Sequence, residues 1–361
     1  MREIKNIIIL RFRRVGDSVL SSPLCSSLRK TFPEARIDYV LNEEIGVLFE
    51  GHPDIDRVIT FKKEEMKDAR TYLTKVRRIM RSGQYDLIID TRSTVKTLWF
   101  ALFSLTTPYR IGRRKAYNRL LHNYRPDTAI EDDEVGRALR LLSPLEKKFD
   151  VHYDRTLKLY VSPEEKASFR RLMADKGIDF SKPVLLCAVT ARLTYKVWDM
   201  ERISQVLQSI IDQYEAQLIF NFGGPEEEEA ALRLQEDMGN HPRIFTNIKA
   251  NNLRELSAML TNADFFFGNE GGPRHISQAL NIPSFAIYPP SVSKKYWLPN
   301  ACERFQGIEV ADISERALDN TLSFKEKFDL LTVDAVWEKL NPMLTKYIIK
   351  IINHEEEEDL A

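Results

Sequence analysis

Residues 263–290 of the chain read ADFFFGNEGGPRHISQALNIPSFAIYPP, and they predict one half of an open α/β sheet. The apolar run Phe265–Phe267 is too short for a helix and is typical of a buried strand. A glycine-rich turn, Gly268–Pro273, leads into a short helix at His275–Leu280, and Ile282–Tyr288 is a second apolar strand. In such sheets ligands bind at the carboxyl ends of the strands, where backbone N–H groups can bind an anion. We therefore expect an anion site in this turn, beside one carboxylate and one imidazole.

The rest of the chain repeats this alternation of strand, loop and helix. Buried strands are predicted at residues 5–12, 36–41, 55–61, 85–90, 184–189, 217–221 and 243–246. Helices are predicted between them at residues 18–32, 64–82, 200–214 and 253–262. This order predicts an α/β protein with mostly parallel, doubly wound sheets.

A helix start at Ser162 separates two groups of strands. Ser162 is a predicted N-cap, and Glu165 completes a capping box. We expect an N-terminal domain at residues 1–161, a C-terminal domain at residues 162–332 and a final helix at residues 333–353. The acidic residues 354–361 are expected to form a disordered tail.

The composition limits the class of protein. The chain has 53 Lys and Arg and 53 Asp and Glu residues, so bulk attraction to nucleic acid is not expected. Cys25, Cys187 and Cys302 lack metal-ligand spacing and are typical of a reduced cytoplasmic protein. No signal peptide pattern occurs, and no apolar stretch reaches the roughly 20 residues that span a bilayer. We expect a cytoplasmic protein, and contact with a membrane surface stays open.

Several common enzyme motifs are missing. The sequence has no G-x-x-x-x-G-K-[ST] loop and no G-x-G-x-x-G after a strand, which disfavours a nucleoside triphosphatase or a dinucleotide dehydrogenase. It also lacks a G-x-S-x-G nucleophile elbow and any His, Cys and carboxylate cluster with metal-ligand spacing.

Two loops after predicted strands carry charged side chains. Asp17 lies at a helix start, where it either complements the helix dipole or serves as a general base. Lys196, with Arg192 four residues earlier, is either an exposed cation or part of a clamp on a phosphate.

Two further loops carry acids and a histidine. Glu226–Glu229 begin a helix after a glycine turn, so they either complement its N-terminus or present one carboxylate to ribose hydroxyls. A lone histidine in a helix is commonly structural, but the position of His275 just after Gly-Gly-Pro favours a functional role.

An ordered set of motifs, covering nearly the whole chain, resembles glycosyltransferase family 9. This is the family of the ADP-heptose:lipopolysaccharide heptosyltransferases. Each motif is short, and their order makes the resemblance specific. The motifs are Arg13-x-x-Gly16-Asp17 with Pro23, Lys196-x-Trp198, Gly223-Gly224-Pro225-Glu226, Gly268-Asn-Glu-Gly-Gly-Pro-x-His275, and Ala279-Leu280-x-x-Pro283.

The resemblance implies a GT-B architecture, in which two Rossmann-like, doubly wound parallel-sheet domains face each other across a cleft. The acceptor would bind to the N-terminal domain and the nucleotide sugar to the C-terminal one. The last helix would cross back to the first domain. The implied reaction is an inverting transfer without metal or cofactor, in which heptose from ADP-heptose moves onto a lipid-linked glycan acceptor.

The same resemblance implies roles for individual residues. Asp17 matches the catalytic base, Lys196 the lysine that holds the donor diphosphate, and Glu227 the ribose-binding carboxylate. The donor site would also include Thr190, Arg192, Glu270, Gly271, Gly272 and His275. The acceptor would contact Arg13, Arg14, Arg113 and Arg114.

The chain departs from the family pattern in two places. Glu270 and Gly271 stand where the family commonly has Asp and then Thr or Ser, and Asp199 follows Trp198 where Pro is common. The first departure leaves open another nucleotide sugar, used for a capsule or surface polysaccharide. A non-catalytic nucleotide-sugar binder, and an epimerase or hydrolase on the same architecture, are further alternatives.

The segment Arg110–Arg125 contains six Lys and Arg residues and no acid. It is either a solvated basic helix or a face that holds the phosphates and acidic sugars of a lipopolysaccharide core. Its apolar members could rest on the inner face of the inner membrane as a peripheral contact. These members are Tyr117, Leu120, Leu121 and Tyr124.

Overall fold

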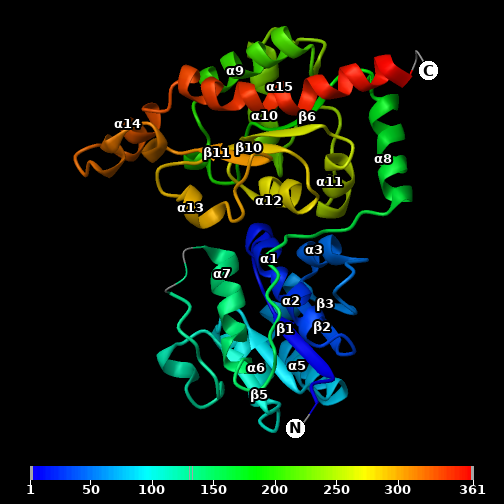
Figure 1. Ribbon diagram of the computed structural model, residues 1–361, viewed down its shortest axis with the longest axis vertical. Helices are drawn as coiled ribbons and strands as arrows, with labels where there is room; N and C mark the ends of the chain where they lie inside the picture. The colour runs from blue at the N-terminus through cyan, green and yellow to red at the C-terminus, as the bar shows by residue number, and fades with distance from the viewer. Residues whose placement is uncertain (1–2, 130, 132, 359–361) are drawn as a thin grey trace. The chain divides into compact units, whose positions relative to one another are not determined.

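The computed structural model describes residues 3–129, 131 and 133–358 of the chain, with side chains as far as residue 349. The chain divides into two compact units, Met1–Tyr160 and Val161–Ala361. The division lies beside the boundary expected between residues 161 and 162. Each unit is an α/β body built on one sheet (Figure 1).

The first unit contains a five-stranded parallel sheet in the order β3-β2-β1-β4-β5. Ile8 on β1 pairs with Asp38 on β2 and with Ile88 on β4, so β1 is the central strand. The strand order reverses between β1 and β4, and ligands bind at such a switch point. The strands are β1 (Asn6–Leu10), β2 (Arg36–Asn42), β3 (Arg57–Phe61), β4 (Leu87–Asp90) and β5 (Tyr109–Gly112).

Helices cover both faces of this sheet, so Ile7–Leu10 of β1 are fully buried (Figure 1). The helices are α1 (Val15–Ser21), α2 (Pro23–Thr31), α3 (Glu43–Gly46), α4 (Lys63–Lys67), α5 (Ala69–Gly83), α6 (Val95–Leu102) and α7 (Glu134–Leu139). Short 3-10 helices are η1 (Val47–Phe49), η2 (Ala116–Asn118) and η3 (Arg140–Leu145).

Two helices predicted as continuous are divided in the structure. The one expected at residues 18–32 ends at Ser21 and restarts at Pro23, because Pro23 has no N–H group to continue the hydrogen-bond ladder. The one expected at residues 64–82 is divided at Asp68, whose carboxylate caps α5 by accepting the Thr71 N–H at 2.8 Å.

The second unit contains a six-stranded parallel sheet in the order β11-β10-β9-β6-β7-β8. Counted from β6, this is the 3-2-1-4-5-6 order of a Rossmann sheet, with its switch point between β6 and β9. The strands are β6 (Val184–Ala188), β7 (Gln217–Phe220), β8 (Ile244–Phe245), β9 (Phe265–Asn269), β10 (Ser284–Ile287) and β11 (Phe305–Ile308).

The helices of the second unit follow the predicted alternation. They are α8 (Pro163–Asp175), α9 (Met200–Tyr214), α10 (Pro225–Asp237), α11 (Leu253–Leu260), α12 (Gly272–Ala279), α13 (Lys294–Trp297), α14 (Phe324–Asp329) and α15 (Val333–Glu358). Short 3-10 helices are η4 (Thr194–Lys196), η5 (Val310–Asp312) and η6 (Glu315–Leu318).

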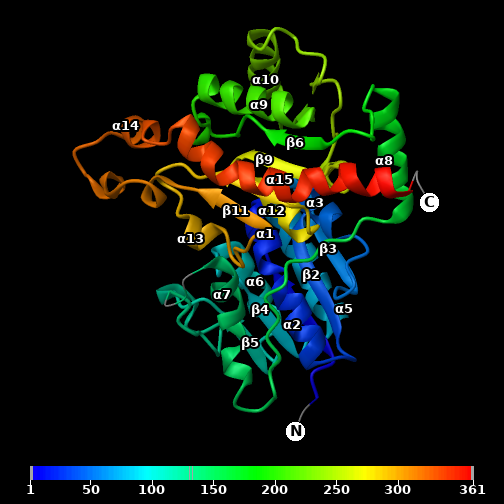
Figure 2. The same ribbon diagram turned by 45° about the horizontal axis from the view of Figure 1, so that its top comes forward.

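The last helix, α15, packs within the second unit along α9 (Figure 2). Its side chains Val336, Leu340, Leu344 and Ile348 are buried in the core of this unit. These apolar contacts belong to the second unit, and our expectation that the helix crosses back to the first domain stays a prediction. The helix also includes residues 354–358, which we expected to be disordered, and residues 359–361 lie outside the described residues.

Candidate active site

The loop after β1 places Asp17 at the switch point of the first sheet. Arg13 and Arg14 in this loop have positive φ values of 74° and 33°. Non-glycine residues hold this strained conformation only where their surroundings fix it. The Asn42 side chain does so here, because its Oδ1 accepts the Arg13 N–H at 2.6 Å. The loop then begins α1 with Asp17 in the first turn.

Two arginines contact the Asp17 carboxylate, which is 8% exposed. Oδ1 lies 2.6 Å from Arg11 Nη2, and Oδ2 lies 3.7 Å from Arg92 Nη1. Burial and the neighbouring Arg11 lower the pKa of Arg92, while Asp17 acts in the opposite direction. One carboxylate oxygen is therefore held by Arg11, and the other can accept a proton from a substrate.

A second carboxylate links these arginines to the segment after β5. Glu134 Oε1 lies 3.4 Å from Arg11 Nη2 and 2.7 Å from Arg113 Nη2. We did not predict Arg92 or Glu134 as site residues, whereas Arg11 was expected with Arg13 and Arg14 on a basic face that holds the acceptor. Arg11 had a sequence signal, because an arginine that directly follows the buried run Ile7–Leu10 must find a partner on folding.

The structure separates the four arginines expected to bind the acceptor. Arg113 is half-buried, and it pairs with Glu134 next to Arg11. The other three, Arg13, Arg14 and Arg114, are exposed. The segment Arg110–Arg125 forms β5, η2 and turns, so the helical alternative for it is wrong.

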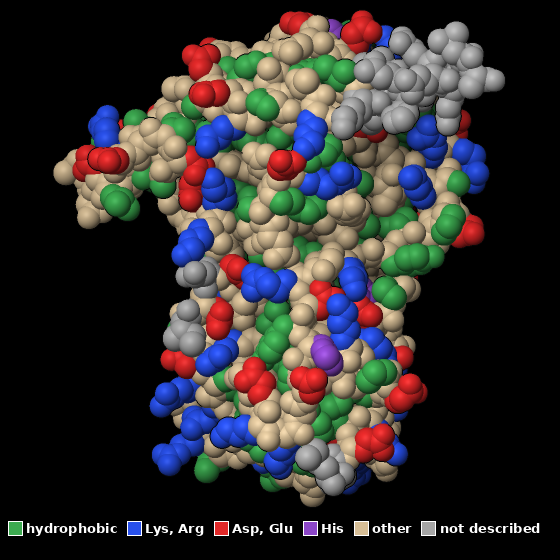
Figure 3. Space-filling model, viewed as in Figure 1, with side chains coloured by type: hydrophobic (Ala, Val, Ile, Leu, Met, Phe, Trp, Pro, Cys, Tyr) green, Lys and Arg blue, Asp and Glu red, His purple; other side chains and the backbone are tan. Residues whose placement is uncertain are grey.

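Cations of this segment line a surface hollow of about 660 Å³, formed by Arg114, Lys115, Ala116, Arg119 and Arg125. Lys and Arg side chains gather on the face of the first unit seen in Figure 3. Leu120 and Tyr117 are 89% and 56% exposed beside the hollow, while Tyr124 stacks on Tyr109 with ring centroids 5.7 Å apart. Among the predicted apolar contacts, Leu120 and Tyr117 are thus the most accessible.

The switch point of the second sheet brings Lys196, Glu270 and His275 together. Lys196 Nζ donates to Glu270 Oε2 at 2.7 Å, and His275 Nε2 lies 3.6 Å from Glu270 Oε1. Glu270 and His275 are buried, and the Lys196 side chain is 19% exposed. Lys196 has three N–H groups, so its ammonium can bind further oxygens beside Glu270.

The charges in this group are well defined. Burial opposes ionisation of Glu270, but His275 and the Lys196 ammonium lower the pKa of Glu270 to about 2. Burial and the adjacent Arg274 guanidinium lower the pKa of His275 to about 4. At neutral pH Glu270 is therefore ionised and the imidazole of His275 is neutral. The Arg274 guanidinium lies 2.5 Å from His275 Nδ1, so His275 links Arg274 to Glu270.

The structure distinguishes among the four glutamates at the start of α10. Glu228 and Glu229 pair with Lys249 and Arg233 at 2.5 and 2.6 Å, and Glu226 is exposed. Glu227 is half-buried, and its Oε2 accepts the Thr190 hydroxyl at 3.0 Å. Since Thr190 follows β6, this contact brings Glu227 and Thr190 to the carboxyl end of the sheet.

Glycines shape the loop between β9 and α12. Gly268 has a φ of 143°, and a Cβ there would lie 2.4 Å from the Ala188 carbonyl oxygen, so only glycine fits. Gly271 is extended, and a Cβ would meet only Pro273 at 3.8 Å, which leaves open space beside Glu270. Gly271 caps α12 without a side chain, so the Gly272 end of this helix offers free N–H groups to an anion. Arg192 is exposed in the loop after β6.

Among the residues that the structure describes, no group of three or more His, Cys, Asp or Glu could hold a metal ion. In the same part of the chain, no helix has the length and apolar character that a bilayer span requires.

The two Rossmann-type sheets, each with charged side chains at its switch point, have the GT-B architecture found in known glycosyltransferases. The model of "Glycosyltransferase family 9 (heptosyltransferase)" matches residues 73–303, and the chain belongs to this family.

Known proteins of this kind resemble the chain over most of its length. Lipopolysaccharide heptosyltransferase 3 of Escherichia coli (strain K12) is 24% identical over 91% of this chain and 95% of its own length. A family 9 glycosyltransferase from Veillonella parvula superimposes with a TM-score of 0.81 at 19% identity, covering 96% of this chain and 99% of its own. The Escherichia coli ADP-heptose lps heptosyltransferase II gives a TM-score of 0.73 at 20% identity, covering 94% and 99%.

Proposed function

We propose that the protein is an inverting heptosyltransferase that moves heptose from ADP-heptose onto a lipopolysaccharide core or related surface glycan. Two observations support this proposal, one in each unit. The first unit has a buried, arginine-bound carboxylate at its switch point, and the second unit has a lysine and an open helix N-terminus at its own. The similarity to an ADP-heptose lps heptosyltransferase supports this donor.

In the proposed reaction Asp17 acts as general base. Its Oδ2 takes the proton of the acceptor hydroxyl, because Oδ1 is occupied by Arg11. The hydroxyl oxygen forms a bond to the anomeric carbon on the face opposite the diphosphate. The bond from that carbon to the diphosphate oxygen breaks, and ADP leaves with the bonding electrons. Attack from the opposite face inverts the anomeric centre.

The donor site stabilises the leaving group. The ammonium of Lys196 and the free N–H groups at the start of α12 face charge that grows on the diphosphate as the bond breaks. Arg192 adds a second cation in the loop after β6. These groups supply the charge that a metal ion supplies in other enzymes, and we propose that the reaction needs no metal. The Glu227 carboxylate would accept hydrogen bonds from the ribose hydroxyls, and the Thr190 hydroxyl beside it would donate one.

The acceptor and the membrane contact belong to the first unit. Phosphates and acidic sugars of a lipid-linked acceptor would bind the exposed Arg13 and Arg14 and the cationic hollow that Arg114 helps to line. The exposed Leu120 and Tyr117 would rest in the interface of the inner membrane, where such side chains are stable. We propose that the enzyme is a cytoplasmic protein with a peripheral contact to the inner membrane.

The proposal is tested by the release of ADP from ADP-heptose in the presence of extracted core acceptor. We expect release that requires both substrates, continues in EDTA and yields a product of inverted anomeric configuration. No release with any core acceptor would contradict the proposed activity, and loss of release in EDTA would contradict the absence of a metal.

A second candidate is a transferase of the same family that uses another nucleotide sugar. The open space at Gly271 beside the longer side chain of Glu270 favours it, because the pocket for the sugar then differs in shape. A panel of donors read by thermal shift separates the two candidates. Stabilisation by a UDP- or GDP-sugar, but not by ADP-heptose, would favour the second.

A further inference from the structure

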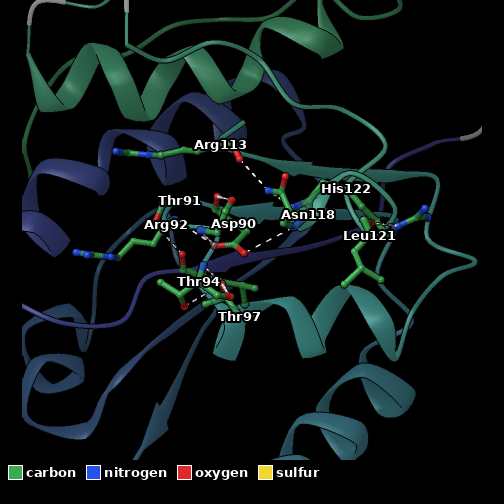
Figure 4. Close-up of polar contacts among 12 residues, drawn as sticks. Asp90, Thr91, Arg92, Thr94, Thr97, Arg113, Asn118, Leu121 and His122 are labelled. Atoms are coloured by element: carbon green, nitrogen blue, oxygen red, sulfur yellow. Dashed lines mark hydrogen bonds and ion pairs between the residues drawn. The ribbon is translucent and has the colours of Figure 1, made fainter. Parts of the chain in front are cut away.

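Three buried polar side chains, Asp90, Asn118 and His122, form a cluster beside the switch point of the first sheet (Figure 4). Asp90 is the last residue of β4, and Asn118 and His122 follow β5. The proposed reaction uses none of them. Burying three polar side chains lowers stability unless each finds a partner, so their contacts are informative.

The contacts of Asn118 define the tautomer of His122. The Lys115 N–H donates to Asn118 Oδ1 at 3.2 Å, so Asn118 Nδ2 is the donor. This nitrogen donates to the Arg113 carbonyl at 2.8 Å and to His122 Nδ1 at 3.0 Å. Because Nδ1 accepts, the proton of the neutral imidazole lies on Nε2, which faces Asp90 Oδ2 at 3.6 Å.

Asp90 Oδ2 and His122 Nε2 are both buried, and neither has a hydrogen-bond partner among the described residues. Burial raises the pKa of Asp90, which His122 opposes, and burial lowers the pKa of His122, which Asp90 opposes. The imidazole lies against β5 at Gly112, where a Cβ would come within 2.5 Å of His122 Nδ1. Each of these two buried polar atoms therefore has the other side chain as its electrostatic partner.

The other carboxylate oxygen of Asp90 shapes the loop after β4. Oδ1 accepts the N–H groups of Arg92 at 3.1 Å and Ser93 at 2.7 Å. Ser93 has a φ of 54°, a left-handed conformation that needs such support. The Tyr117 hydroxyl donates to the Ser93 carbonyl at 2.6 Å. These bonds fix the backbone from which the Arg92 side chain extends.

Two series of contacts connect the cluster to the surroundings of Asp17. In the first, Asp90 holds the backbone of Arg92, whose guanidinium lies 3.7 Å from Asp17 Oδ2. In the second, Asn118 holds the carbonyl of Arg113, whose guanidinium bonds Glu134 at 2.7 Å. Figure 4 shows the side chains of Arg92 and Arg113 extending to the same side, away from Asp90 and His122.

We propose that Asp90, Asn118 and His122 are positioning residues. They hold Arg92 beside the catalytic carboxylate of Asp17, and they hold Arg113 beside Glu134, which contacts the Arg11 that binds Asp17. This inference rests on the proposed function, since it gives the cluster a role in the reaction of Asp17. A merely structural cluster would stabilise the first unit without affecting the rate of transfer.

The test is a double-mutant cycle between Asp90→Asn and Arg92→Ala. Asp90→Asn keeps the shape of the side chain but turns an N–H toward His122 Nε2–H. We expect kcat to fall about 10- to 100-fold with the donor KM unchanged, the range typical when a group that orients an active-site side chain is lost. In the Arg92→Ala background, Asp90→Asn should lower kcat by less than about a further twofold, because both substitutions remove the same contribution of the Arg92 side chain. Asn118→Ala replaces Asp90→Asn if that variant does not fold, with the same expectation in an Arg113→Ala background.

Asp38→Asn is the matched control. Asp38 is equally buried in the same sheet, where it accepts hydrogen bonds from Tyr85 and Arg57 at 2.5 and 2.6 Å. We expect Asp38→Asn to lower thermal stability and leave kcat unchanged. Independent, multiplicative effects of Asp90→Asn and Arg92→Ala, or a kcat equal to that of wild type, would overturn the inference.

A readout without substrate separates this inference from the proposed function. The Arg92 Nε–H resonance in ¹⁵N spectra should shift in Asp90→Asn and in Asp17→Asn but not in Asp38→Asn. If this resonance shifts as expected while ADP-heptose gives no ADP, the proposed donor fails and the positioning role stands. If wild type releases ADP and the resonance does not move in Asp90→Asn, the positioning role fails and the proposed function stands.

Discussion

The Lys196–Glu270 ion pair contributes both to the stability of the fold and, as we propose, to donor binding, and substitutions can separate the two contributions. Glu270 is ionised within the protein, and Lys196 compensates its charge at 2.7 Å. The same ammonium is proposed to bind the donor diphosphate. A change at either residue alone therefore affects both stability and transfer.

Lys196→Met should lower the free energy of unfolding by about 1–3 kcal/mol, because a buried carboxylate loses its partner. Adding Glu270→Gln should recover most of that loss, but transfer should stay low because the cation is still missing. Urea unfolding and donor KM measure the two effects. Full activity in the stable double variant would exclude Lys196 from the donor site.

Glu227 and Glu226 give a matched pair for the ribose contact. Glu227→Gln should raise the donor KM about 10-fold or more, since a hydrogen bond to a charged group is worth about 1.5–3 kcal/mol. Glu226→Gln should have no effect, because Glu226 is exposed on α10. Equal effects of the two substitutions on KM would contradict the assignment.

Individual site residues could be predicted from the sequence only in part. Asp17 and Lys196 follow strands, so their position at the ligand edge of a sheet was predictable. The selection of Glu227 over its neighbours required the resemblance to a family, and the contact with Thr190 agrees with it. Arg92 and Glu134 were not predicted, because they reach Asp17 through contacts across 75 and more positions of sequence.

At the scale of elements, the segment between β5 and α7 is expected to hold the acceptor. Changing Arg114 and Arg119 together to Ser should raise the acceptor KM several-fold and leave the donor KM unchanged. The effect should shrink at high salt, because exposed charges are screened over about 8 Å at physiological ionic strength. Acceptor KM measured from low to high salt tests this, and a change confined to donor KM would contradict it.

The elements themselves were largely predictable. Apolar runs between polar helices indicated nine of the strands, because a strand buried on both faces is almost continuously apolar. The strands β5 and β11 were missed, since YRIG and FQGI interrupt their apolar residues with polar ones at the edges of the sheets. The breaks at Pro23 and Asp68 depend on local capping, which periodicity does not reveal.

At the scale of the whole molecule, both units use the same strand order from the edge through the switch point, and both have a group of charged side chains there. The first unit contains the buried histidines His52 and His122, and the second unit contains the buried His275. Burial lowers the pKa of His52 and that of His275 to about 4, and it also lowers the pKa of His122.

These histidines predict an acid-sensitive stability. An unfolded histidine binds a proton near pH 6.5, whereas His52 and His275 stay neutral in the fold until about pH 4. Between these values the unfolded state binds more protons, so stability should fall as the pH decreases from 6.5 to 4, by about 3 kcal/mol for each histidine. His52→Gln and His275→Gln should each reduce this slope in denaturant unfolding, with pH 8 as the reference. A slope equal to that of wild type would contradict the prediction.

The central claim is that Asp17 removes the proton of the acceptor hydroxyl. The most direct measurement is kcat for ADP release by Asp17→Asn, which keeps the shape of the side chain and its place beside Arg11. We predict a fall of about 10²–10⁴-fold, the usual contribution of a general base, with the Kd for ADP-heptose unchanged. Turnover at the wild-type rate would contradict the account.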